Sequence, residues 1–443
     1  MGGLMGGLRA TSVIAGNLYR NGRGQDFRAI GNVNKISTLS TLAYSTALIP
    51  IFLTSGNWVQ SFSHHLGQGQ GLTDAEAHQV QKYFNGFVWG APATLLLYND
   101  AQFSLGVGDT YLPLLYQGVV YPVLAILLAR PLALGEWGSP YQLGVEGIGH
   151  AMSIGATAAW VLMRTHYLFS ERYKPYELFN FKGVKGFGRY WKFCGPWALQ
   201  NAVSLFSGFF TSELLTGLNQ NVAAAYSGTS AYFTQLEVAL LGYSSSIAAL
   251  VANHNTPTLT EEDRLLKQKN LKTLSYAGMV TVLGATTILT VPYLIWQDPF
   301  IAYFAGEGLP PEASKLAHTY IWFNFVDSLV DSYGTAVEAT LHGVKDITIP
   351  SLISLSETGL SLLVTWLAAE YAGESGTAII AASIAADVYS AAALSTRWWQ
   401  VARSLRERVA NVVRNPVGGA RRLWGYVTNL FVRDEGNLRV DFS

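Results

Sequence analysis

GVGDTYLPLL at residues 106–115 and GVKDITIPSL at residues 343–352 are two copies of one motif, 237 residues apart. Five of the ten positions are identical: the leading glycine and valine, the aspartate, the proline and the final leucine. Each copy lies between long apolar stretches, so the repeat indicates two similar helix bundles in a membrane. In transporters built from such repeats, the substrate binds between the two repeats.

The composition supports a membrane protein. Charged residues make up 13% of the 443 residues and hydrophobic residues 50%, and this charged fraction is about half the usual one in soluble domains. Small residues are abundant inside the apolar stretches and allow helices to pack closely in lipid. The formal net charge of zero argues against nucleic acid as a partner. Cys194 is the only cysteine, which excludes an internal disulfide.

Ten apolar stretches are long enough to cross a bilayer. They lie at 36–58, 80–105, 113–134, 143–168, 190–216, 223–252, 272–296, 317–341, 348–371 and 376–399. Lys and Arg gather before the first span, between spans four and five, between six and seven, and after the last. The segments that connect the other ends of the spans carry almost no Lys or Arg. The positive-inside rule therefore predicts that both termini are cytoplasmic. We expect the protein in a cell inner or plasma membrane.

The repeat extends upstream and sets the expected domains. Gly6 and Ala15-Gly16-Asn17 match Gly242 and Val251-Ala252-Asn253, so residues 1–17 correspond to the last half of the sixth span. The alternative is that these residues form only an interfacial segment. We predict an incomplete N-lobe with four full spans at 1–170, a cytoplasmic linker at 171–189, a C-lobe with six spans at 190–400, and a basic amphipathic tail at 401–443. The two lobes share one orientation, as parallel repeats do.

A set of short motifs carries a family resemblance. In order they are GAPA at 90–93, GVGDT at 106–110 with Pro113, PLALG at 131–135, LGVEGIGHA at 143–151, and GP at 195–196 with LQN at 199–201. This order resembles MATE (multidrug and toxic compound extrusion) transporters over about residues 1–400. The resemblance implies two lobes of helices around a V-shaped cavity, alternating access, and export of organic, often cationic compounds against Na⁺ or H⁺.

Two features depart from that family. Its first helix, which in many members carries a cavity aspartate, has no counterpart, so the chain reads as lacking the first one and a half helices. Many members also have a glutamate eight residues after the proline of the seventh helix, where this chain has Ser204. Both departures concern cation coupling.

Acidic residues in the later spans form the candidate cation-coupling site. Asn324, Asp327, Asp331 and Glu338 fall within an arc of about 60° on a helix that turns 100° per residue. Carboxylate oxygens suit Na⁺, and clustered carboxylates raise each other's pKa so that one can carry a proton. Asp331 also matches the family's tenth-helix aspartate linked to cation coupling. Glu357 and Asp387, in the last two spans, are the further candidates of this lobe.

The substrate cavity has a second set of candidates. Gln200, Asn201 and Ser204 lie on one side of the fifth span, where helix–helix hydrogen bonds are the alternative. Asp100 is the comparable acid of the first lobe and would replace the missing first-helix aspartate, with a salt bridge near a loop as the alternative. Asp109 and Asp346 are predicted to cap the helices that their motifs begin.

The tail from Arg397 alternates arginines with apolar residues at helical spacing. This pattern predicts an amphipathic helix on the inner membrane face, bound to anionic lipid. No phosphate-binding loop, catalytic triad or Cys/His cluster is evident, so neither an enzyme, a cofactor nor a metal is expected. His64-His65, in a predicted external loop, lacks further ligands at metal spacing.

The sequence therefore predicts an all-α polytopic membrane protein, with about ten transmembrane helices in two parallel-repeat lobes. The leading function is secondary antiport of small organic compounds in exchange for Na⁺ or H⁺, and the ligands are the bilayer and a small-molecule substrate. One alternative is a non-transporting partner subunit or degenerate paralogue, with another membrane protein covering the incomplete N-lobe. The other is a lipid-linked glycan flippase, which ranks lower because the spans are nearly free of Lys and Arg.

Overall fold

The computed structural model describes residues 2–20, 27–66, 73–136, 142–218, 220–254, 261–305, 309–371 and 375–414. Regular structure in these ranges is entirely helical. The elements are α1 (Gly2–Arg20), α2 (Phe27–Leu53), α3 (Ser55–Leu66), α4 (Asp74–Phe87), α5 (Ala91–Gly106), η1 (Pro113–Val120), α6 (Tyr121–Leu134), α7 (Val145–Phe169), η3 (Lys174–Tyr176), α8 (Phe187–Leu218), α9 (Gln220–His254), α10 (Glu261–Ile295), α11 (Gln297–Ala305), α12 (Pro311–Gly343), α13 (Thr348–Tyr371) and α14 (Gly376–Arg414).

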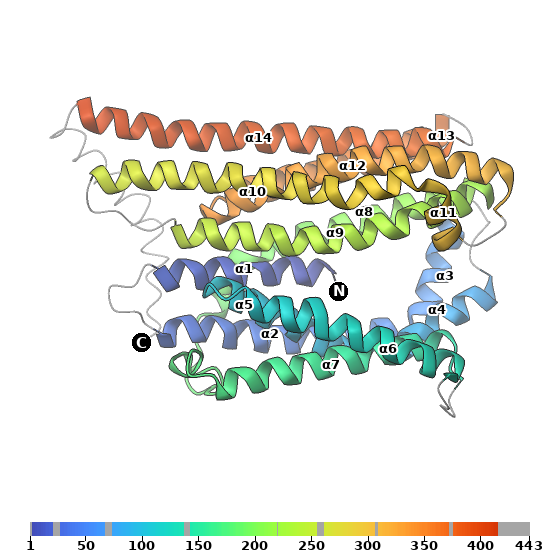
Figure 1. The fold of residues 1–443 in the computed structure, drawn as a ribbon, viewed down its shortest axis with the longest axis horizontal. Helices are drawn as coiled ribbons and strands as arrows, with labels where there is room; N and C mark the ends of the chain where they lie inside the picture. Colours follow the sequence, from blue (N-terminus) through green and yellow to red (C-terminus); the bar gives the residue numbers. More distant parts are fainter. Residues whose placement is uncertain are drawn as a thin grey trace.

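The long helices run side by side along one axis (Figure 1). We call α1–α7 the first bundle and α8–α14 the second bundle; the predicted domain boundaries within this division stay a prediction. Among the described residues, five helices are by themselves long and apolar enough to cross a membrane. They are Phe27–Leu53, Pro113–Leu134, Lys269–Ile295, Thr348–Tyr371 and Gly376–Ala402. The fold class expected from the sequence is confirmed.

Helix α1 is the main part of the first bundle that packs against the second, and it reproduces half of α9. A Cβ on Gly106 of α5 would lie 2.8 Å from the carbonyl oxygen of Ser12 in α1. A Cβ on Gly343 of α12 would lie 2.8 Å from the carbonyl oxygen of Ala248 in α9. The repeat is thus visible in the packing: α1 contacts α5 as the second half of α9 contacts α12. Nearly all residues of α1 from Gly7 to Asn17 are buried, so this part of the helix packs inside the fold and is not an interfacial segment.

The single span predicted at 80–105 is two helices, α4 and α5, separated by a turn at 88–90. Pro92 lacks an amide hydrogen and its ring displaces the carbonyl four residues earlier, which breaks the helix. Ser153 of α7 replaces the lost hydrogen bonds: its hydroxyl donates to Gly86 O at 2.7 Å and accepts from Gly90 N at 3.0 Å. Non-helical backbone inside a bundle persists where a neighbouring helix supplies such partners.

The crossing of α4 and α7 depends on glycine. A Cβ on Gly149 would lie 2.3 Å from Tyr83 O, and a Cβ on Gly86 would lie 2.3 Å from Glu146 O. We expect Gly149→Ala to force the two backbones apart and to destabilise the protein by about 1–3 kcal/mol, the usual effect of overpacking. Thermal unfolding of the purified protein measures this.

Gly284→Ala in α10 is the matched control, since a Cβ there would meet nothing within 4 Å. Equal unfolding temperatures for the two variants would show that the α4–α7 crossing does not need a glycine at 149.

Asp109 caps the helix that follows it, as predicted. Its Oδ1 accepts from the backbone amides of Tyr111 at 3.1 Å and Leu112 at 3.4 Å. Its Oδ2 lies 3.3 Å from Arg172 Nη1 and accepts from the Tyr173 hydroxyl at 2.9 Å. Burial raises the pKa of the Tyr173 phenol, which keeps its proton available for this bond. In the second copy, Arg397 donates to Asp346 at 2.6 Å.

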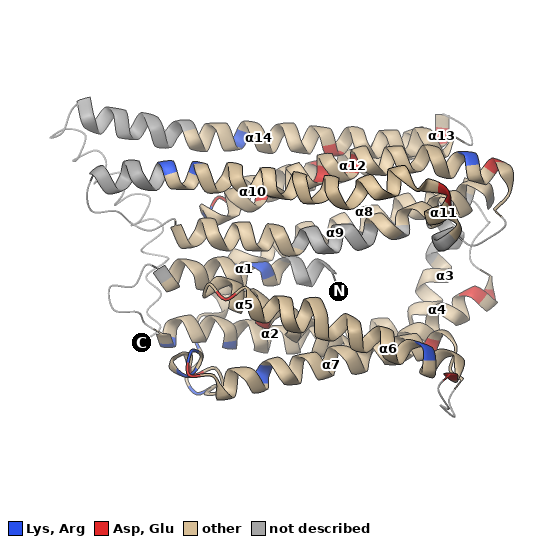
Figure 2. Ribbon diagram, in the orientation of Figure 1, with Lys and Arg blue, Asp and Glu red and all other residues tan. Residues whose placement is uncertain are grey.

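Basic residues gather at the end of the bundles where the loop between α7 and α8 lies (Figure 2). This distribution agrees with the positive-inside argument, but the orientation and the specific membrane stay predictions. His64-His65 falls within α3 rather than in a loop.

Helix α14 continues without a break through residue 400 to Arg414. The first part of the predicted amphipathic tail is therefore an extension of the last apolar helix. Residues 415–443 lie outside the described residues, and the anionic-lipid contact stays a prediction.

Candidate functional site

The residues predicted on one side of the span at 317–341, which we call the acidic stripe, lie on α12 and face other helices. They are Asn324, Asp327, Asp331 and Glu338. Trp322 and Val326 are 54% and 46% exposed and define the outer side of this helix. Asp331 is five residues beyond Val326, which turns it about 140° around the axis. The stripe residues are therefore directed away from the outer side of the second bundle.

Three helices of the second bundle bring their carboxyl groups together. Asp327 of α12 interacts electrostatically with Asp387 of α14, and Asp387 interacts in the same way with Glu357 of α13. Carboxyl groups from three helices are therefore neighbours in the second bundle.

Asp331 completes this carboxylate cluster, which we define as Asp327, Asp331, Glu357 and Asp387. It interacts electrostatically with each of the other three, and its Oδ1 accepts from Thr335 at 3.3 Å. Asp331 is the exposed member, whereas the other three are half-buried. The cluster therefore has one exposed carboxylate and three half-buried ones. No group of three His, Cys, Asp or Glu in the described residues has the geometry of a metal site.

Glu338 lies two helical turns beyond Asp331 on α12 and is not a member of the carboxylate cluster. Gln200 Nε2 donates to its Oε1 at 2.6 Å, and the Ser354 hydroxyl donates to the same oxygen at 3.4 Å. His342 Nε2 lies 3.7 Å from that oxygen. Gln200 and Glu338, which the sequence assigned to different sites, thus form one contact between α8 and α12.

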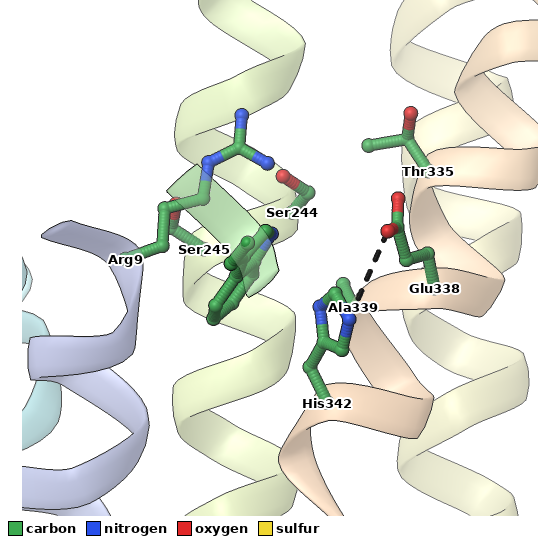
Figure 3. A pocket seen from close by; sticks show the side chains of 8 residues that line it. Arg9, Ser244, Ser245, Thr335, Glu338, Ala339 and His342 are labelled. Carbon is green, nitrogen blue, oxygen red and sulfur yellow. Dashed lines mark ion pairs between the residues drawn. The ribbon is translucent and has the colours of Figure 1, made fainter. Parts of the chain in front are cut away.

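Glu338 also lines a small cavity between the bundles. We call it the inter-bundle pocket; its lining residues are Arg9, Trp197, Ser244, Ser245, Thr335, Glu338, Ala339 and His342. Figure 3 shows Arg9 of α1 on one side and Glu338 and His342 of α12 on the other. Thr335 joins the pocket to the carboxylate cluster, because it donates to Asp331.

The remaining α8 candidates make helix contacts. Asn201 Nδ2 donates to Trp197 O of its own helix at 2.9 Å. The hydroxyl of Ser204 lies 3.3 Å from that of Thr358 in α13, a helix–helix hydrogen bond. Asn324 is 9% exposed, and its Nδ2 has no hydrogen-bond partner within the described ranges.

Asp100 does not line the inter-bundle pocket. It is fully buried, and its Oδ2 lies 2.7 Å from Arg164 Nε. Asn34 Nδ2 donates to Oδ1 at 3.1 Å, and Trp160 Nε1 donates to Oδ2 at 3.1 Å. Arg164 also donates to Thr38 at 2.9 Å. The salt-bridge alternative describes Asp100 better, although the pair lies within the first bundle rather than near a loop.

Arg9, Trp197, Ser244, Ser245 and His342 were not predicted as site residues. The repeat held a signal for two of them, because Arg9 precedes Ala15 by the same interval by which Ser245 precedes Val251. The two equivalent positions therefore line one pocket. Trp197 of α8 and His342 of α12 become neighbours only in the folded chain, with ring centroids 4.1 Å apart.

No protein-family model and no curated protein sequence matches this chain. Solved structures do match. The eukaryotic MATE transporter AtDTX14 is similar with a TM-score of 0.73 and 16% identity, over 92% of this chain and 87% of that one.

Two further structures extend the comparison. An outward-facing multidrug resistance MATE family transporter of the MOP superfamily has a TM-score of 0.71 at 14% identity, over 91% of this chain and 86% of its own. A MOP superfamily transporter from Pyrococcus furiosus has a TM-score of 0.70 at 14% identity, with the same coverage. The chain is thus an all-α polytopic membrane protein with the fold of the MATE transporters.

Proposed function

We propose that this protein is a secondary active antiporter, which exports small organic, often cationic compounds in exchange for Na⁺ or H⁺ by alternating access. The observation that carries the proposal is the carboxylate cluster, with Asp331 exposed and Asp327, Glu357 and Asp387 half-buried. Acidic groups are costly inside a membrane unless they face water, a partner or a transported cation. The MATE fold supports the same conclusion at the level of architecture.

The proposed coupling works by differential affinity. A cation that binds the cluster neutralises carboxylates contributed by α12, α13 and α14, and so changes the forces between these helices. It shifts the inward–outward equilibrium only as far as it binds one state more tightly than the other. Na⁺ and H⁺ compete for the same carboxylate oxygens in this scheme.

Efflux from proteoliposomes tests the proposal. The purified protein is reconstituted, the vesicles are loaded with ethidium, and efflux is followed after a Na⁺ or pH gradient is imposed. We expect one of the two gradients to accelerate efflux above that of empty vesicles. Equal efflux with and without protein, under both gradients and over a panel of organic cations, would contradict the antiporter function and favour a non-transporting partner subunit.

A stability measurement identifies the coupling ion independently of the substrate. A ligand that binds the folded state raises the unfolding temperature by mass action. We expect Na⁺, compared with choline at equal ionic strength, to raise the unfolding temperature of the wild type but not of Asp331→Asn if Na⁺ is the coupling ion. No difference between Na⁺ and choline at any pH would leave H⁺ as the coupling ion.

The flippase alternative depends on basic groups in the cavity. The sequence argument against it, that the spans are nearly free of Lys and Arg, did not include Arg9, which lines the inter-bundle pocket. This pocket is far too small for a glycan-lipid headgroup. The antiporter remains the better-supported function.

A further inference from the structure

Arg9 of α1 is a buried cation at the place where the two bundles meet. It is 6% exposed, and its Nε donates to the Tyr98 hydroxyl of α5 at 3.3 Å. No carboxylate in the described ranges forms an ion pair with Arg9. A guanidinium buried in a membrane protein is costly unless acidic groups or carbonyl oxygens compensate it. The charges that compensate Arg9 therefore act over a longer distance than an ion pair.

The buried acids of the first bundle already have arginine partners of their own. Asp100 Oδ2 lies 2.7 Å from Arg164 Nε, and Asp109 Oδ2 lies 3.3 Å from Arg172 Nη1. Asp100 also accepts hydrogen bonds at both of its oxygens. Neither acid lines the inter-bundle pocket, where Arg9 lies. The negative charge that Arg9 meets is therefore to be found in the second bundle.

Two carboxylates of α12 supply that charge. Glu338 lines the same pocket as Arg9, and Figure 3 shows the two side chains on opposite sides of it. Arg9 acts electrostatically on Glu338 and on Asp331. Glu338 also interacts with Asp331, and Thr335, another lining residue of the pocket, donates to Asp331 at 3.3 Å. Arg9, Glu338 and Asp331 thus form one electrostatic group that includes both bundles.

We propose that Arg9 is an internal counter-cation, which competes with the coupling ion for the charge of Glu338 and Asp331. A positive charge stabilises ionised carboxylates near it and repels a second cation. Arg9 therefore lowers the affinity of these carboxylates for Na⁺ or H⁺. The inference rests on the antiporter proposed above, because it assigns the residue that sets the ion affinity of that antiporter.

The competition also changes the force between the bundles. Arg9 belongs to the first bundle, and Glu338 and Asp331 belong to the second, so their attraction draws the bundles together. A cation that binds the carboxylates neutralises them and removes this attraction. Arg9 thus makes the contact between the bundles depend on ion occupancy, which is the differential coupling that alternating access requires.

The ion requirement of transport tests the competition. Efflux from proteoliposomes is measured over a range of concentrations of the ion that drives the wild type. We expect Arg9→Gln to reach half-maximal efflux at an ion concentration about tenfold lower, because a nearby opposing charge is removed. Loss of a merely structural contact would not tighten ion binding.

Two control variants accompany this measurement. Arg9→Lys keeps the positive charge and should stay close to the wild type. Arg130→Gln removes an arginine that is 66% exposed and should equal the wild type. An ion requirement of Arg9→Gln that is unchanged or higher would overturn the proposal.

A double-mutant cycle tests the same interaction without transport, so it decides the role of Arg9 even if the antiporter proposal fails. The unfolding temperatures of Arg9→Gln, Glu338→Gln and the double variant are measured in lipid nanodiscs without Na⁺. Arg9→Gln leaves Glu338 without its counter-charge, so its effect should shrink to about half or less in the Glu338→Gln background. If Arg9→Gln alone does not fold, Glu338→Gln should restore folding in the double variant. Equal effects of Arg9→Gln in both backgrounds, or a double variant that does not fold where Glu338→Gln does, would overturn the counter-cation.

Discussion

Replacing Asp331 by Asn is expected to lower gradient-driven efflux by roughly tenfold or more. The side chain keeps its size and its hydrogen bond to Thr335 but loses the charge that attracts the coupling cation. A loss of only about 1.4 kcal/mol in cation binding is already a factor of ten in affinity. Because Asp331 is exposed, the substitution should leave folding intact. The measurement is ethidium efflux from proteoliposomes under the gradient that drives the wild type.

Asp298→Asn is the matched control, because this aspartate is 88% exposed and contacts only His318 in an ion pair among the described residues. Its efflux should equal that of the wild type. Unchanged transport by Asp331→Asn, with the protein folded, would remove Asp331 from the coupling mechanism. A loss in both variants would point to a general charge effect instead.

The second large effect is expected at the ion pair between Asp100 and Arg164. Both side chains are buried, at 0% and 11% exposure, and their charged atoms lie 2.7 Å apart. Removing one partner leaves an uncompensated charge, which costs about 3–5 kcal/mol in measured cases. We therefore expect Arg164→Gln and Asp100→Asn each to lower the unfolding temperature strongly.

The double variant separates the pair from its surroundings. Asp100→Asn with Arg164→Gln should be less destabilised than the sum of the two single variants, since neither charge is then left alone. Glu136→Gln removes one partner of the exposed pair with Arg130 and should cost less than about 1 kcal/mol. Full additivity at Asp100 and Arg164 would contradict a coupled ion pair.

Much of the fold was predictable because it depends on local pattern. The repeat of Gly106 and Gly343 marks positions where two helices approach too closely for any side chain, so both copies needed a glycine. Helical periodicity placed Asp327 and Asp331 on one side of α12. The capping role of Asp109 followed from its distance to Pro113.

What the sequence could not supply was tertiary proximity. Asp387 and Glu357 were candidates on separate spans, and only the packing of the helices makes them neighbours. Arg9 was missed because α1 is too rich in glycine and polar residues to read as a span, although it is buried between the bundles. The partner of Asp100 was not evident because Arg164 is 64 residues away in the sequence.

Cysteine accessibility tests most directly whether Asp331 faces water. Cys194 is the only native cysteine and is buried, so a Cys194→Ser background allows one labelled position at a time. Thiols react as thiolates, which form in water rather than in lipid. The account predicts fast labelling of Asp331→Cys in nanodiscs by a charged methanethiosulfonate, and slow labelling of Val326→Cys on the outer side of the same helix. Labelling of Asp331→Cys no faster than that of Val326→Cys would contradict the account.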